Sequence, residues 1–145
     1  MAITVRKLEN DLHFEAENEK GGKLRMDGNN TIGGLEGGLS PMQLLLAGIG
    51  GCSSVDVLNI LNKQRQQVED YRVEITADKK SVGTYSEYKT INLNFILEGD
   101  LDEQKVERAI ELSINKYCSV SKALEKISKI SYSYEIKQEI PAKKD

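Results

Sequence analysis

The stretch Ser40–Ser54, SPMQLLLAGIGGCSS, decides how this chain folds, because it begins a helix and then places glycines inside it. Ser40 can cap the helix, Pro41 suits the first helical position, and Gln43 completes a capping box. The next residues are apolar on nearly every side, a pattern typical of a helix that is buried all round. We expect this helix to continue to about Gln66.

Three glycines, Gly48, Gly50 and Gly51, lie directly before Cys52. A glycine inside a helix costs about 1 kcal/mol relative to alanine, so something must offset the loss. Close approach of another backbone, or of a substrate, to the helix surface would do so. The sequence therefore predicts a helix face that is kept free of side chains beside the Cys52 thiol.

The other segments predict strands and two shorter helices. Residues 1–27 read as short antiparallel strands, and alternating apolar residues predict further strands at 71–77, 90–97 and 130–136. The polar link 79–88 reads as a hairpin loop, and 120–127 as a shorter helix that buries Val120, Ala123, Leu124 and Ile127. Asp100 reads as the cap of a helix before it, one face of which is lined at helical spacing by Val106, Ala109, Ile110, Ser113, Ile114 and Tyr117.

The order of these elements is strands, long helix, two strands, two helices and a strand. This order lacks βαβ alternation, so we expect the α+β class with mainly antiparallel sheet. A chain of 145 residues is of the length of one domain, and we expect residues 1–145 to form one.

Charge and composition exclude several function classes. The net charge is −3 and the charges are interspersed, which argues against a nucleic-acid partner and against a membrane surface. The N-terminus lacks an apolar core of signal-peptide length, and the apolar run 41–55 is too short to cross a bilayer. We therefore expect a cytoplasmic protein.

The chain has 2 cysteines, Cys52 and Cys118, and 1 histidine. We expect no structural disulfide, because the cytosol is a reducing compartment. The chain has neither a CxxC nor an HxxxH motif, so we also expect no metal and no cofactor. Cys118 lies between two predicted helices, where free N–H groups would favour a thiolate. The alternative for each cysteine is an inert, buried, small side chain.

Three motifs resemble the family of osmotically inducible protein C and organic hydroperoxide resistance proteins (OsmC/Ohr): SPMQL at 40–44, AGIGGCS at 47–53 and KYCSV at 116–120. The resemblance extends from about Arg6 to Ile136, and it is closest to the branch that carries GGCS and KYCSV. It implies an OsmC/Ohr-like intertwined homodimer, in which sheets wrap around long central helices and the active sites lie at the subunit interface.

The resemblance also implies a thiol-dependent peroxidase for organic hydroperoxides, active in oxidative or osmotic stress defence. In this family the first cysteine, here Cys52, attacks the peroxide as a thiolate and becomes a sulfenic acid. The second, here Cys118, condenses with it to a disulfide, and an external dithiol reduces the pair. The helix-end argument favours Cys118 as the more acidic thiol, whereas the family assigns the attack to Cys52.

The chain departs from the hydroperoxide-resistance branch at two positions. That branch has a glutamate where this chain has Met42, and an arginine where this chain reads Glu9-Asn10. Arg25 and Glu36 are the candidates to replace this supporting pair. Two other functions stay open: a module of the same fold that binds a small molecule or senses oxidation with little turnover, and a structural protein with inert cysteines.

Overall fold

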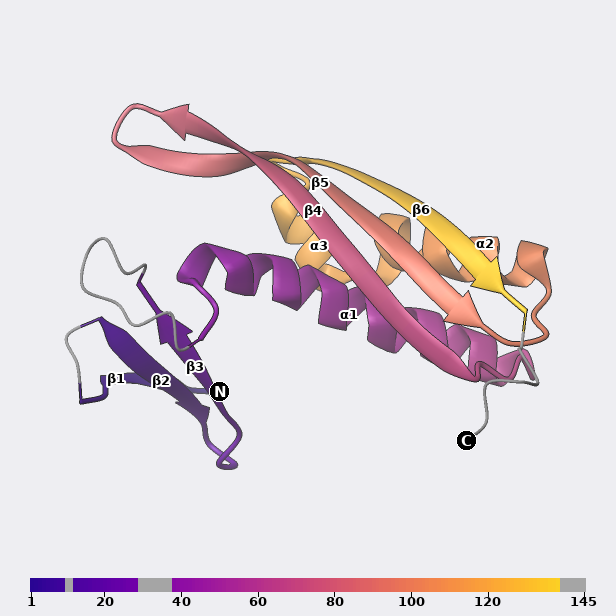
Figure 1. The fold of residues 1–145 in the computed structure, drawn as a ribbon, viewed down its shortest axis with the longest axis horizontal. Coiled ribbons are helices and arrows are strands. Elements are labelled where there is room, and N and C mark those ends of the chain that lie inside the picture. The colour runs from indigo at the N-terminus through magenta and orange to yellow at the C-terminus, as the bar shows by residue number, and fades with distance from the viewer. Residues whose placement is uncertain (10–11, 29–37, 139–145) are drawn as a thin grey trace. The chain divides into compact units, whose positions relative to one another are not determined.

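The chain forms two compact units in the computed structural model, Met1–Leu46 and Ala47–Asp145, and each is described by itself. Helix α1 (Pro41–Lys63) begins in the first unit and continues in the second (Figure 1). That residues 1–145 act as a single domain stays a prediction. The structure describes all residues except 10–11, 29–37 and 139–145.

The first unit contains an antiparallel sheet in the order β1-β2-β3. Its strands are β1 (Ile3–Lys7), β2 (His13–Asn18) and β3 (Lys23–Asp27), which confirms the short strands predicted for this region. The β2–β3 turn is held by the side chain of Asn18, whose Oδ1 accepts hydrogen bonds of 2.9 Å from the backbone N–H groups of Lys20 and Gly22.

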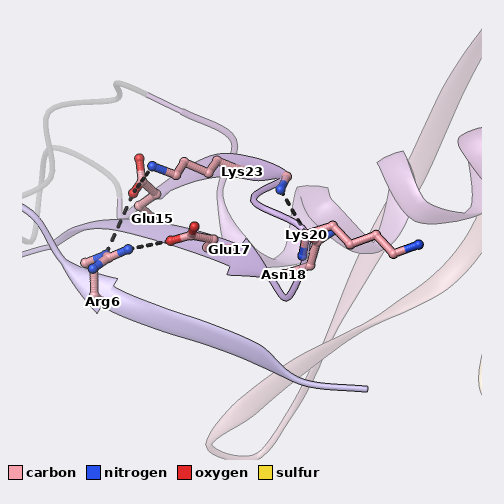
Figure 2. Close-up of polar contacts among 7 residues, drawn as sticks. Arg6, Glu15, Glu17, Asn18, Lys20 and Lys23 are labelled. Atoms are coloured by element: carbon pink, nitrogen blue, oxygen red, sulfur yellow. Dashed lines mark hydrogen bonds and ion pairs between the residues drawn. The ribbon is translucent and has the colours of Figure 1, made fainter.

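Ion pairs link the three strands of this sheet on one face (Figure 2). Arg6 lies 2.5 Å from Glu17 and 3.8 Å from Glu15, and Lys23 lies 4.0 Å from the same Glu15 oxygen. The Arg6 and Lys23 side chains are more than half exposed, so each of these pairs adds about 1 kcal/mol or less.

The second unit contains a sheet in the order β4-β5-β6, whose strands lie side by side in Figure 1. Its strands are β4 (Asp70–Val82), β5 (Tyr85–Glu98) and β6 (Lys129–Lys137). β4 and β5 are antiparallel as expected, but β5 and β6 are parallel. Parallel neighbours need a crossover connection, and the helices between β5 and β6 supply it. The expected lack of a βαβ connection is therefore wrong here, although the α+β class holds.

The predicted loop at 79–88 is also wrong, because both strands continue through it to a tight turn at Gly83. Gly83 has φ +66°, a left-handed conformation that glycine adopts without strain. The paired residues near this turn include Lys80 opposite Glu87. Cross-strand pairs of opposite charge stabilise a polar ladder, so the lack of apolar residues does not end the strands.

The helices begin and end near the predicted residues. α1 ends at Lys63, and Arg65 follows in a left-handed conformation with φ 60°. The predicted cap Asp100 is wrong: α2 (Glu103–Leu112) is capped by Asp102, whose carboxylate accepts the backbone N–H groups of Gln104 and Lys105. A π-helical turn, η2 (Ser113–Tyr117), and a short helix, α3 (Ser119–Leu124), follow.

α1 and α2 pack on the same face of the second sheet. Tyr71 of β4 lies 2.7 Å from Ser54 of α1, and Tyr134 of β6 donates to Glu107 of α2 at 2.9 Å. Tyr71 pairs with Leu97 of β5, and Tyr134 pairs with Phe95 of β5. Because Phe95 and Leu97 are two residues apart and so share a face of the sheet, Tyr71 and Tyr134 project from that same face. The core beneath this face includes Ile49, Val57, Leu61, Ile91, Leu93, Phe95, Leu97, Val106, Ala109 and Ile110.

The prediction that the first half of α1 is buried on every side is wrong for the single chain. It buries one face, whereas Leu45 is 45% and Val55 is 70% exposed. By length and composition alone the helix could cross a bilayer, contrary to the expectation from residues 41–55, but core helices of soluble proteins meet the same criterion. The buried side chains of α1, which include Ile49, Val57 and Leu61, belong to the core of the second unit.

The apolar faces predicted for the shorter helices are confirmed in part. Ile114 is buried as expected, but Tyr117 is 52% exposed, because the wide η2 turn changes the helical period before α3. Ser121 is the fully buried residue of α3, and Ile127 is 63% exposed. Burial of Ala123 and Ile127 is thus a wrong prediction.

Candidate functional site

The structure brings together the two cysteines that the sequence singled out. Cys52 lies on α1, and Cys118 lies between η2 and α3. The two Sγ atoms and a carboxylate oxygen of Asp56 all lie within 4.8 Å of one another. Asp56 is a residue that the motifs do not predict. The signal for it is its position one helical turn after Cys52, on the same face of α1.

The backbone around Cys118 fixes the direction of its thiol. The N–H of Cys118 donates to the carbonyl of Ser113 at 2.8 Å, which closes the π turn. The sulfur then takes the N-cap position of α3 and accepts the N–H of Ser121 at 3.3 Å. The Ser121 hydroxyl donates to the carbonyl of Ile114 at 3.0 Å, so α3 is tied back to η2.

Ser113 connects the π turn to α1. Its hydroxyl oxygen lies 3.0 Å from Asp56 Oδ2 and 3.3 Å from the carbonyl oxygen of Ser53. The single hydroxyl hydrogen can be donated to either acceptor. Because Ser113 and Ser53 are fully buried, this contact holds the Asp56 carboxylate in place at the edge of the core.

Burial raises the pKa of the Cys118 thiol to about 11. The N–H of Ser121 acts in the opposite direction, and the neighbouring Cys52 thiol raises the pKa further. The helix-end expectation is therefore outweighed, because the sulfur has no solvent contact and the backbone N–H groups of Ser121 and Val120 lower its pKa by less than burial raises it. Cys52 is only partly buried and is the more accessible sulfur.

The glycines before Cys52 allow close packing as predicted, but not all of them for the same reason. A Cβ atom at Gly50 would lie 2.7 Å from Ile75 Cδ1, so β4 packs directly on the helix there. A Cβ at Gly48 would make an ordinary contact of 3.8 Å with Val120. Gly51 is exposed, and a Cβ there would meet nothing within 4 Å. It leaves the surface next to Cys52 open.

Arg25, one of the two predicted supporting residues, belongs to the first unit, whereas both cysteines belong to the second. Arg25 lies on β3 in the first unit, exposed and opposite Glu15 in the strand register. Glu36 lies outside the described residues. The supporting roles of Arg25 and Glu36 stay predictions.

Comparison with known proteins shows the family and the fold of this chain. Residues 33–133 match the family of OsmC-like proteins. Protein YhfA of Escherichia coli (strain K12) is 41% identical over 126 residues, which cover 86% of this chain and 90% of that protein. A hypothetical protein from Aquifex aeolicus VF5, known from its crystal structure, is 30% identical with a TM-score of 0.81, covering 96% of this chain and 97% of that one.

An organic hydroperoxide resistance protein OsmC from Legionella pneumophila has the same fold at 18% identity, with a TM-score of 0.70 over 92% of this chain and 95% of that one. The fold is thus that of the OsmC/Ohr proteins and belongs to the α+β class. This chain belongs to the OsmC-like family. The resemblance drawn from the SPMQL, GGCS and KYCSV motifs is confirmed at the level of the family and the fold.

Proposed function

We propose that this protein is a thiol-dependent peroxidase that reduces organic hydroperoxides through Cys52 and Cys118. One observation carries the proposal: the two sulfurs lie within 4.8 Å of each other, one partly accessible and one fully buried. An accessible attacking thiol with a protected partner at this distance is the arrangement that a sulfenic acid–disulfide cycle needs.

The proposed reaction has three steps. The Cys52 thiolate attacks the outer peroxide oxygen, the O–O bond breaks, and the alkoxide leaves and takes a proton from solvent to become an alcohol. Cys52 is now a sulfenic acid, which condenses with the Cys118 thiol to a disulfide and releases water. An external dithiol reduces this disulfide by thiol–disulfide exchange and is itself oxidised. No cofactor takes part.

The raised pKa of Cys118 supports this division of roles. A thiol that titrates near pH 11 is almost fully protonated at neutral pH and is a poor first nucleophile. Cys118 can still react with the Cys52 sulfenic acid, because the two sulfurs already lie within 4.8 Å of each other and the packing of their helices holds them there.

The proposal includes a cytoplasmic homodimer that acts in oxidative or osmotic stress defence, with its active sites at the subunit interface. Exposed apolar side chains on α1, Leu45 and Val55, support the dimer, because a second copy would cover them. The open surface at Gly51 would let that copy approach the Cys52 thiol.

The test is turnover. The protein would be mixed with cumene hydroperoxide and excess dithiothreitol, and peroxide loss followed for wild type, Cys52→Ser and Cys118→Ser. The proposal predicts that the wild-type protein consumes many equivalents of peroxide, and that Cys52→Ser consumes none above background. The Cys118→Ser protein should turn over slowly, through direct reduction of the sulfenic acid. Equal rates for Cys52→Ser and wild type would contradict it.

A second candidate function is a redox sensor, or small-molecule-binding protein, with little turnover. The observation in its favour is the burial of Cys118, which keeps that sulfur away from an external reductant. In the turnover assay this function would give one round of peroxide loss and then stop.

A further inference from the structure

We propose that Cys52, Cys118 and Asp56 together bind a zinc ion when the two thiols are reduced. Metal binding at these residues is a different activity from the redox cycle, and it does not depend on the peroxidase proposal. It uses a carboxylate to which that cycle assigns no role.

The distances suit a tetrahedral ion. With Zn–S bonds of about 2.3 Å, the ligand atoms of a tetrahedral zinc site lie about 3.8 Å apart. The two sulfurs and the Asp56 oxygen lie within 4.8 Å of one another, so side-chain adjustments of about 1 Å would close the site. Cys52 and Asp56 are on neighbouring turns of one helix, which keeps both ligands in register without any backbone change.

The donor set selects the metal by its chemistry. Two soft thiolates and one harder carboxylate, all three anionic, suit the borderline ion Zn²⁺, whereas Mg²⁺ and Ca²⁺ prefer all-oxygen sites. Binding releases the two thiol protons to solvent and forms two Zn–S bonds with no change in oxidation state. The fourth ligand position would be filled by water, because Cys52 and Asp56 are only partly buried.

Hydrogen bonds behind the ligands complete the site. Ser113 lies 3.0 Å from Asp56 Oδ2 and orients the carboxylate, and the N–H of Ser121 points at the Cys118 sulfur at 3.3 Å. Such outer contacts fix ligand orientation and raise metal affinity. Ser113 is buried, so the orientation of Asp56 is set before any ion arrives.

The sequence argues against a metal only because its ligands are far apart along the chain. Known zinc motifs place paired ligands a few residues from each other, whereas Cys52 and Cys118 come from different helical elements. The α1–η2 contact at Ser113 brings them together.

The experiment is a cobalt titration of the reduced full-length protein under anaerobic conditions, with a phosphine reductant in place of a dithiol. Co²⁺ reports tetrahedral thiolate ligation by a charge-transfer absorption, and added Zn²⁺ should displace it. The expected result is one ion per chain. Asp56→Asn, which keeps its shape and its contact with Ser113, should weaken binding by at least about 10-fold, the scale seen for lost outer-shell contacts alone. Cys52→Ser and Cys118→Ser should each abolish the charge-transfer band.

The matched control is Asp100→Asn, which removes an exposed carboxylate at another position and should bind like wild type. Unchanged affinity in Asp56→Asn, or a charge-transfer band that survives either cysteine change, would overturn the proposal. Should a variant fail to fold, alkylation of wild type decides: Zn²⁺ must slow the labelling of the accessible Cys52 thiol by iodoacetamide, and unchanged labelling would overturn the proposal. Because the titration contains no peroxide, its outcome is independent of the peroxidase proposal.

Discussion

The two thiols differ most in how far solvent reaches them. Cys118 has no exposed surface and its pKa is raised by burial, while Cys52 is partly exposed. At pH 8 iodoacetamide should therefore label Cys52 at least about 10-fold faster than Cys118, because only the thiolate reacts and only accessible thiolates are reached. Peptide mass mapping over time measures both rates. Faster labelling of Cys118 would show that the assigned roles are reversed.

The raised pKa of Cys118 also makes a prediction for stability. The folded state favours the neutral thiol, with the pKa moved from 9.0 to about 11, so the contribution is present below about pH 9 and is lost as pH rises through about 11. A serine does not titrate in this range. The difference in unfolding free energy between wild type and Cys118→Ser should shrink by about 2–3 kcal/mol from pH 8 to pH 12.

Denaturant unfolding of the reduced proteins at both pH values would measure this difference. Groups that do not contact Cys118 titrate alike in the two proteins, so their contributions cancel. A difference that stays constant with pH would mean that burial does not hold the Cys118 thiol neutral.

At the level of elements, the return from β5 to α2 depends on Gly99. Gly99 has φ +141°, and a Cβ there would lie 2.9 Å from the carbonyl oxygen of Gln67. Gly99→Ala should lower the unfolding free energy by about 1–3 kcal/mol, because alanine is strained at this φ and its methyl group would clash with the carbonyl oxygen of Gln67. Gly48→Ala is the control, since it lies in α1 with room for a methyl group and should be neutral or gain up to about 1 kcal/mol. Equal stabilities for the two variants, measured by denaturant unfolding, would contradict this.

Most elements could be predicted from periodicity, because strands and helices repeat apolar residues at different spacings. The parallel pairing of β6 could not, since it depends on where the α2, η2 and α3 connection returns the chain. The Asp102 cap and the continuation of β4 and β5 through polar residues were decided by local hydrogen bonds and cross-strand pairs. Such hydrogen bonds and cross-strand pairs can override the alternation of apolar residues and the sequence signals for helix caps, on which the prediction rests.

The site could be predicted in the same partial way. The glycines and the two cysteine motifs predict a functional thiol pair, and the structure places those sulfurs together. Asp56 could not be assigned, because an aspartate on a helix is usually a solvated residue, and its contact with Ser113 joins segments 57 residues apart. The raised pKa of Cys118 could not be predicted either, because its main cause is burial, which depends on tertiary packing.

At the scale of the whole molecule, the exposed apolar face of α1 argues for a second copy of the chain. Val55 is 70% exposed on a helix whose other face is in the core. Val55→Lys should shift the protein from dimer to monomer, because a buried, unpaired charge would be placed in the interface. Gln104→Lys on α2 carries the same charge change at an exposed polar position and should stay dimeric. Analytical ultracentrifugation would measure both, and a monomeric wild-type protein would contradict the proposed homodimer.

The most direct test of the central claim, that Cys52 and Cys118 form a peroxide-driven redox pair, is the intact mass of the reduced protein after one equivalent of cumene hydroperoxide. The expected product in wild type has lost two hydrogen atoms, as a disulfide does. The Cys118→Ser protein should instead gain one oxygen atom, as a sulfenic acid, and Cys52→Ser should keep its mass. A wild-type mass that does not change over minutes, or the same product in Cys52→Ser, would contradict the claim.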